Sequence, residues 1–145
     1  MAEALYTREI LRLAMSLPAG DDIVDPDAEA YCRSPICGSE MTVQLALDKD
    51  NSIAKLTISA KACAMGQASA AILRKNAPGC SAEEIGDIHG SITAYLIGQG
   101  EMPDQWPQLD ELAAARGYPA RHAAILLPYK ALLSAFDKLC SAHPA

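Results

Sequence analysis

Five cysteines are the residues of this chain that could bind a metal or act as nucleophiles: Cys32, Cys37, Cys63, Cys80 and Cys140. Because five is an odd number, a complete set of intramolecular disulfides is excluded. Zinc and iron–sulfur clusters take four protein ligands, mostly cysteine, with histidine or aspartate as substitutes. Cysteine is also among the most buried residue types, so spacing alone favours a structural thiol over a ligand.

A predicted β-hairpin brings two of these cysteines together. Residues 41–47 and 53–60 alternate apolar and polar side chains, and the polar segment 48–52 between them is typical of a turn. Cys37 lies just before the first strand and Cys63 just after the second. Because the strands of a hairpin are antiparallel, we expect these two residues to be neighbours. Cys63 would also open the next helix, where backbone N–H groups and the helix dipole stabilise a thiolate.

Helices are predicted on both sides of this hairpin, with a short edge strand before it. Proline and glycine breaks, helical spacing and a capping box at Ser81 and Glu84 define their limits. The helices are expected at residues 3–17, 64–76, 82–98, 107–117 and 120–140, and the edge strand within 22–32. Trp106 is expected to anchor a loop to the core. A helix, a small antiparallel sheet packed against helices, and further helices make an α+β fold.

The composition bounds the class of protein. The 145 residues fit a single domain spanning 1–145, and half of them are hydrophobic. The formal net charge of −6 argues against a nucleic-acid partner, which usually requires a basic face. No apolar run is long enough to span a membrane, and the first residues lack the pattern of a secretory signal. We therefore expect a cytoplasmic protein with reduced thiols.

Four segments carry a resemblance to a known family. They are Leu5-Tyr6 with Ile10-Leu11; Ser34-Pro35-Ile36-Cys37-Gly38; Lys61-Ala62-Cys63-Ala64-Met65 with Ala68-Ser69-Ala70; and residues 112–132, which include Tyr118-Pro119-Ala120-Arg121 and Tyr129-Lys130-Ala131-Leu132. In this order they resemble the iron–sulfur cluster assembly scaffolds: NifU N-terminal domains, IscU and especially SufU. The resemblance implies a SufE/NifU-like fold and either transient cluster assembly or zinc binding. It also implies a cysteine desulfurase and apo-protein clients as partners.

The chain departs from the family pattern at positions that usually bind the metal. The third family cysteine falls at Ala124, the basic or histidine position before it at Ala123, and the family aspartate at Ser39. Only Cys37 and Cys63 of the four usual ligands are therefore present.

Other residues are candidates to complete the site. His122 would reach it only if the last helix began late, because on a regular helix it points about 200° away from Ala124. Ser39, Glu40, Cys32 or a partner protein's cysteine are further candidate ligands. Arg121 matches a family arginine and could pair with Glu40 or stabilise the Cys37 thiolate. The remaining residues are expected to play no part: Cys80 as a loop thiol, Cys140 as peripheral, and His89 and His143 as solvated side chains.

Three functions remain open from the sequence. The first is a scaffold-like protein that binds iron, an iron–sulfur cluster or zinc through Cys37 and Cys63. The second is a metal-free paralogue that acts as an interaction module. The third is a thiol or persulfide sulfur carrier that uses Cys63. No Cys–His pair with an orienting group is evident, so a hydrolase is not expected. We expect a protein that is not an enzyme, with a sulfur-acceptor role still open.

Overall fold

A three-stranded antiparallel sheet forms one layer of the structure, a computed structural model that describes residues 5–18 and 22–142, with side chains as far as residue 139. The strands are β1 (Ala28–Arg33), β2 (Glu40–Leu47) and β3 (Ile53–Lys61), in the order β1-β2-β3. Val43 lies opposite Ile58, and Glu40 lies opposite Lys61 at the end of the hairpin. The predicted hairpin is confirmed, with each strand one residue longer than expected, and β1 is the predicted edge strand.

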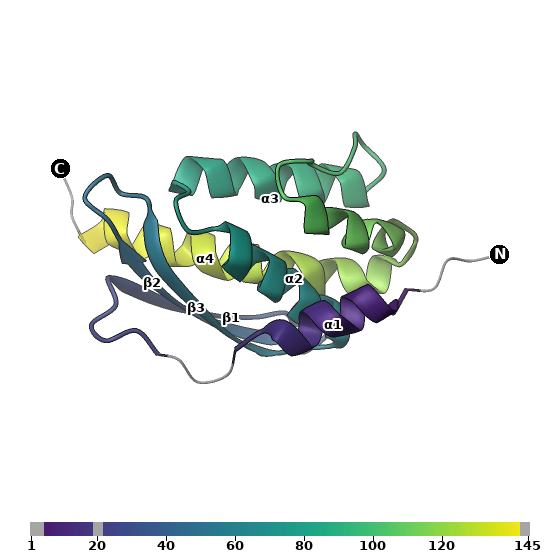
Figure 1. The fold of residues 1–145 in the computed structure, drawn as a ribbon, viewed down its shortest axis with the longest axis horizontal. Helices are drawn as coiled ribbons and strands as arrows, with labels where there is room; N and C mark the ends of the chain where they lie inside the picture. Colours follow the sequence, from purple (N-terminus) through teal and green to yellow (C-terminus); the bar gives the residue numbers. More distant parts are fainter. Residues whose placement is uncertain (1–4, 19–21, 143–145) are drawn as a thin grey trace.

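Helices cover one face of this sheet, because its alternating side chains are apolar on that face only. Met41, Val43 and Leu45 are fully buried, while the intervening residues of β2 are only half-buried. Helices α2 (Ala64–Asn76) and α4 (His122–Ala142) pack against the strands, and α3 (Ala82–Leu96) lies beyond them (Figure 1). Helix α1 (Arg8–Ser16) packs along α2.

The helix boundaries follow local capping chemistry. Helix α1 begins at Arg8, not at residue 3, because the Thr7 hydroxyl caps it by accepting a hydrogen bond from the N–H of Ile10. The capping box at Ser81 and Glu84 starts α3 as predicted, and α2 has the predicted bounds.

The helices after α3 lie close to their predicted positions, but two of them are 3₁₀-helices. The segment from Pro107 to Gly117 is the 3₁₀-helix η1, where an α-helix was expected. A second short 3₁₀-helix, η2 (Pro119–Arg121), precedes α4, which therefore begins at His122 and not at residue 120. Proline at the first position of each of these short helices has a backbone angle suited to a helix start.

Helix α4 contains a proline, and α2 is hydrogen-bonded to α4 in the turn before it. Pro128 has no N–H to donate to the carbonyl of Ala124, four residues earlier. The buried Ser69 of α2 donates its hydroxyl to the next carbonyl, that of Ile125, at 2.7 Å. This bond ties the middle of α2 to the first half of α4.

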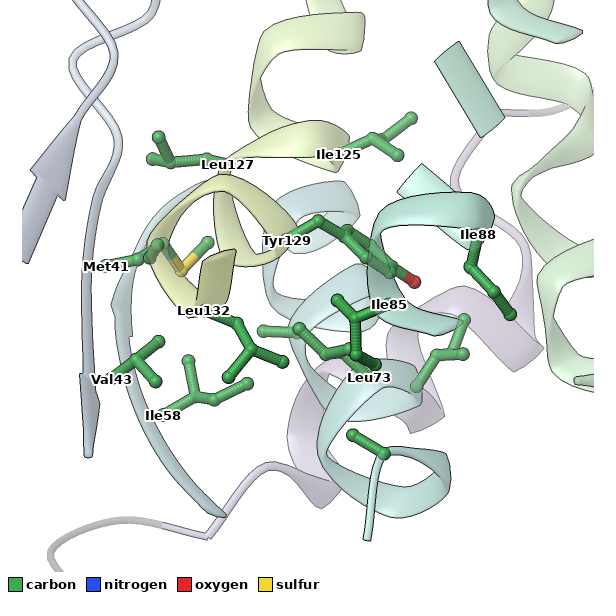
Figure 2. Close-up of a cluster of buried hydrophobic side chains, with 14 of the residues drawn as sticks. Met41, Val43, Ile58, Leu73, Ile85, Ile88, Ile125, Leu127, Tyr129 and Leu132 are labelled. Atoms are coloured by element: carbon green, nitrogen blue, oxygen red, sulfur yellow. The ribbon is translucent and has the colours of Figure 1, made fainter. Parts of the chain in front are cut away.

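Tyr129 of α4 lies at the centre of the core and is fully buried (Figure 2). The Trp106 ring stacks on it at a centroid distance of 6.4 Å, which confirms that Trp106 anchors its loop. The His89 ring lies 6.4 Å from the same tyrosine. The expectation that His89 is solvated was wrong, because α3 turns its Nε2 atom into the protein, where it is buried. Burial, and then the charge of Lys130, lower the pKa of His89.

None of the helices in the described ranges is long and apolar enough to cross a membrane.

Candidate functional site

The turn between β1 and β2 presents Cys37 at one end of the sheet. The N–H of Ser34 donates to the Ser39 carbonyl at 2.9 Å, and the N–H of Gly38 donates to the Ser34 carbonyl at 2.8 Å. Gly38 has a φ of +74°, a value that favours glycine. The turn predicted at Ser34-Pro35 is therefore present, and it leaves the Cys37 side chain exposed.

The junction between β3 and α2 presents Cys63 at the same end. Cys63 is the N-cap of α2 and half-buried, and its side chain makes no capping hydrogen bond. The register pairs Glu40 with Lys61 at the open end of the hairpin. Cys37 lies three residues before Glu40 and Cys63 lies two residues after Lys61, so both lie at this end. The antiparallel geometry expected from the sequence thus brings the two cysteine-bearing turns together.

Two buried serines surround the Cys37 thiol. The Cys37 Sγ lies 3.1 Å from the Ser39 Oγ, and the N–H of Cys37 donates to the Ser34 Oγ at 3.5 Å. Partial burial alone would raise the pKa of Cys37, but hydrogen bonds from Ser39, from Ser34 and from backbone N–H groups outweigh it and lower the pKa. Ser34 was not singled out from the sequence, although its place before Pro35 in the turn was a usable signal.

Ser39 is the residue that the resemblance places at the family aspartate. It is 4% exposed and offers a hydroxyl, which can donate a hydrogen bond to a thiolate. A carboxylate at the same position could only accept, and its charge would raise the pKa of Cys37. The exchange of aspartate for serine therefore favours the thiolate form in this chain.

The other charged and basic candidates have different contacts. His122 is the first residue of α4, and its Nε2 lies 2.8 Å from the Ala115 carbonyl oxygen, so this nitrogen is held by the backbone of η1. The Glu40 carboxylate accepts a hydrogen bond from the Tyr31 hydroxyl, which is the main cause of a raised pKa of Tyr31. The Arg121 guanidinium lies 5.8 Å from the centre of the Tyr6 ring.

The remaining cysteines lie elsewhere. Cys32 is opposite Met41 on the core-facing side of β1, and it is half-buried against the core. Cys80 lies beside Ile53 at the far end of β3, where its thiol is 3.7 Å from the Asn76 carbonyl. The Cys140 side chain and His143 fall outside the described part of the structure.

Ala124, where the resemblance places the third family cysteine, packs against the first turn of α2. Ala124 is 1% exposed, and a Cβ added to Gly66 would lie 3.3 Å from the Ala124 Cβ and 2.9 Å from the Ala62 Cβ. Gly66 is three residues after Cys63, so the missing ligand position borders the helix start that Cys63 caps. The sequence did not identify Gly66, and its only signal was a glycine inside a helix of small residues.

The donor set among the described residues is therefore incomplete for a four-ligand centre. Within residues 5–18 and 22–139, no three side chains of His, Cys, Asp or Glu are grouped so that they could hold a metal ion. Cys37 and Cys63 supply two thiols, and the third position is apolar and sealed.

Comparisons with known proteins agree with this fold. Residues 5–125 match the family described as NifU-like N terminal domain. The N-terminal part of a nitrogen-fixing NifU-like protein from Brucella abortus is similar over 96% of each chain, with a TM-score of 0.89 and 28% identity. A putative iron–sulfur cluster assembly scaffold protein for the SUF system from Fervidobacterium islandicum has a TM-score of 0.81 and 20% identity over 90% of this chain and 96% of its own. No curated protein matches the chain.

Proposed function

The chain belongs to the family of NifU-like N-terminal domains, and on this premise we propose that it is an iron–sulfur cluster assembly scaffold whose site residues are Cys37 and Cys63. The observation that carries the proposal is the presence of both thiols at the same end of the sheet in this fold. The cargo is iron or an iron–sulfur cluster, with zinc as the alternative metal, and the scaffold unit is the single domain 1–145.

The chemistry of the two thiols suits transient binding. Metals bind thiolates, and the lowered pKa of Cys37 increases its thiolate fraction near neutral pH. Because Cys37 is exposed, a metal can reach the site and leave it again without unfolding of the core. A reducing cytoplasm would keep both thiols free, a cysteine desulfurase would supply sulfur, and apo-protein clients would receive the cluster.

The neighbouring candidates have supporting roles in this proposal. Ser39 acts through its hydroxyl on Cys37, and Glu40 lies at the end of β2 beside the same turn. His122 Nε2 lies 2.8 Å from the Ala115 carbonyl oxygen, so a metal would have to bind this residue through Nδ1. Arg121 contributes positive charge near the start of α4.

Anaerobic reconstitution tests the proposal. The protein is incubated with ferrous iron and sulfide, or with zinc alone, and then desalted and analysed for metal and for cluster absorbance. We expect binding by the wild type and by the matched control Cys80→Ser, whose thiol lies at the far end of β3. Cys37→Ser and Cys63→Ser should each lose most of the metal. Wild-type protein with neither metal nor absorbance, and with a melting temperature unchanged by EDTA, would instead support a metal-free interaction module.

A second function, that of a persulfide carrier, is favoured by the environment of Cys37. This thiol is exposed and contacts two buried serines, whereas Cys63 is half-buried and makes no capping bond. The structure therefore favours Cys37 over Cys63 as the acceptor. The test is incubation with a cysteine desulfurase and cysteine, followed by mass spectrometry of the intact chain. The addition of one sulfur atom to wild type and to Cys80→Ser, but not to Cys37→Ser, would support this role; no addition to wild type would exclude it.

A further inference from the structure

A groove lies at the end of the sheet remote from Cys37 and Cys63, and the function proposed above does not use it. The β2–β3 turn, the first turn of α3 and the last turns of α4 line this groove, and Figure 1 shows these segments on the same side of the molecule. Its volume is about 750 Å³. From Glu40 at the cysteine end to Leu47 at the groove, β2 spans about 23 Å at ~3.3 Å per residue. We propose that this acidic groove binds a basic segment of another protein that also carries apolar side chains.

The floor of the acidic groove is apolar. Leu47 is the last residue of β2, and Phe136 and Leu139 come from α4. Leu47 and Leu139 are half-buried against the core, while Phe136 is 7% exposed. An apolar side chain of a partner would cover the parts of these residues that remain exposed to water, as at the centre of a protein interface.

Carboxylates from four segments form the rim around this floor. They lie before β1, in the β2–β3 turn, on α3 and on α4: Asp27, Asp48, Asp50, Glu83 and Asp137. No lysine or arginine is among the described residues that line the groove. Lys138 follows Asp137 in the sequence, but its Nζ donates to the Glu29 carbonyl at 2.7 Å. Within the described part of the chain, no salt bridge involves a carboxylate of the rim. The rim is therefore a region of uncompensated negative charge.

The arrangement of the carboxylates determines which kind of cation fits. Among the described residues, no three acidic side chains are grouped so that they could hold a metal ion. The charge is instead spread around the rim, which suits several separate lysine or arginine side chains of one peptide. A nucleic acid or an anionic membrane carries phosphates, which the rim would repel. A second copy of this chain has a net charge of −6 and would be repelled at long range.

The backbone holds part of the rim in place before any partner binds. The Asp27 carboxylate accepts a hydrogen bond from the N–H of Leu47 at 2.7 Å, and the Asp48 carboxylate accepts one from the N–H of Ser52 at 3.0 Å. A rim that is already ordered loses less entropy on binding. The other three carboxylates belong to exposed residues and can be neutralised without loss of these bonds: Asp50, Glu83 and Asp137.

A partner bound at this groove leaves the other end of the sheet free. Cys37 remains exposed at that end, and the junction that carries Cys63 remains open to the same side. The chain would therefore be attached to another protein through one end and keep its two thiols accessible at the other.

The test measures the binding of a short fluorescein-labelled peptide of lysine, leucine and glycine by fluorescence anisotropy. We expect saturable binding by the wild type and by Cys37→Ser. Each exposed ion pair contributes a factor of up to about five in affinity, so the triple variant Asp50→Asn/Glu83→Gln/Asp137→Asn should bind about tenfold more weakly. Peptides with glutamate in place of lysine, or with serine in place of leucine, should bind the wild type more weakly.

The matched control is Glu101→Gln/Asp104→Asn/Asp110→Asn, which removes the same charge from exposed residues beyond the end of α3. Because salt screens attraction over such distances, this variant should keep the wild-type affinity within about twofold. Thermal melting of both triple variants checks that they are folded. In amide NMR spectra of the wild type, the lysine peptide should shift the signals of Asp50 and Glu83 and leave that of Cys37 unchanged.

Four results would overturn the proposal. The first is the absence of saturable binding by the wild type, and the second is equal weakening in both triple variants, which would show an effect of net charge alone. The third is a set of NMR shifts confined to residues outside the groove. The fourth comes from light scattering: a dimer that the groove variant loses would make a second copy the occupant in place of a basic partner. None of these results bears on metal binding by Cys37 and Cys63.

Discussion

The close contact between α2 and α4 at Gly66 yields the sharpest prediction, because this contact sets the position of Cys63 relative to residue 124. In Gly66→Ala the new methyl group would lie 2.9 Å from the Ala62 Cβ, 3.3 Å from the Ala124 Cβ and 3.4 Å from the Ala124 carbonyl oxygen. None of these atoms is the end of a flexible side chain, so the turn at Ala62 must shift and α4 must give by a few tenths of an ångström at Ala124.

Two opposing effects determine the magnitude. Overpacking of this kind costs about 1–3 kcal/mol. Alanine in a helix interior is more favourable than glycine by roughly 0.5–1 kcal/mol. We therefore expect a net loss of about 0.5–2 kcal/mol in the free energy of unfolding. For a chain near this length, ~1 kcal/mol corresponds to a change of ~2–4 °C in melting temperature.

Gly90→Ala is the matched control. Gly90 is exposed inside α3, and a Cβ added there would meet no atom within 4 Å. Only the propensity effect remains, so this variant should be more stable than wild type by about 0.5–1 kcal/mol. Both variants are compared with wild type by urea denaturation and by thermal melting, without metal. If Gly66→Ala melts at or above the wild-type temperature, as Gly90→Ala should, the argument for a tight α2–α4 contact is wrong.

Four other predictions follow from single side chains. Cys63→Ser should stabilise the metal-free protein by up to about 1 kcal/mol in thermal melts, because serine can make the capping hydrogen bond that Cys63 lacks. The iodoacetamide alkylation rate of Cys37 should rise at lower pH than that of Cys80, because hydrogen bonds outweigh burial and lower the pKa of Cys37, whereas burial and then Glu84 raise the pKa of Cys80. Equal profiles, measured on single-cysteine peptides by mass spectrometry, would contradict this. Burial lowers the pKa of His89, so the folded state favours the neutral imidazole. Its contribution to stability is therefore present above the unfolded-state pKa of ~6.5 and is lost as pH falls below that value. Between pH of about 8 and 5.5, the melting temperature of His89→Gln should fall by less than that of the wild type. Ala124→Cys places a third thiol against the first turn of α2, and its melting temperature should rise more with added zinc than that of wild type.

The hairpin and the α2 boundaries could be predicted because their signals are local. The apolar alternation in residues 41–47 determines which face of β2 is buried, and the register then follows from the short polar turn. The start of α3 was equally predictable, because its capping box uses only Ser81 and Glu84. In each case the residues that define the element also make its hydrogen bonds.

The helix type of residues 107–117 and the start of α4 could not be predicted in the same way. The apolar side chains of η1 pack on α2 and α3 as they would in an α-helix, so their spacing does not distinguish a 3₁₀-helix. The start of α4 at His122 depends on η2, whose own position is set by Pro119 and by the N–H of Arg121 on the Tyr118 carbonyl. These are contacts between turns, and the spacing of apolar residues along the sequence does not predict them.

Part of the candidate site could be predicted from local patterns, and part of it depends on tertiary contacts. The sequence predicted that the turn before β2 and the start of α2 would meet, because both follow from the antiparallel hairpin. It left the contacts of His122, Arg121 and Ser39 open, because each depends on a partner far along the chain or on the shape of a turn. The contact between the buried Ser39 hydroxyl and Cys37 depends on the shape of the turn, which the sequence did not specify.

The two departures from the family pattern act on the site in the same direction. By the resemblance, serine at position 39 replaces a carboxylate and alanine at position 124 replaces a thiol that becomes charged only when it ionises. Fewer anions nearby mean less repulsion between thiolates when no metal is bound, and the hydroxyl of Ser39 stabilises the Cys37 thiolate directly. If the resemblance places the ligands correctly, the same changes also remove two of them, so this chain would bind a metal less tightly than a full set of ligands would. Under the proposed scaffold function, two thiols without a third grouped ligand among the described residues would favour exchange of a metal over its retention.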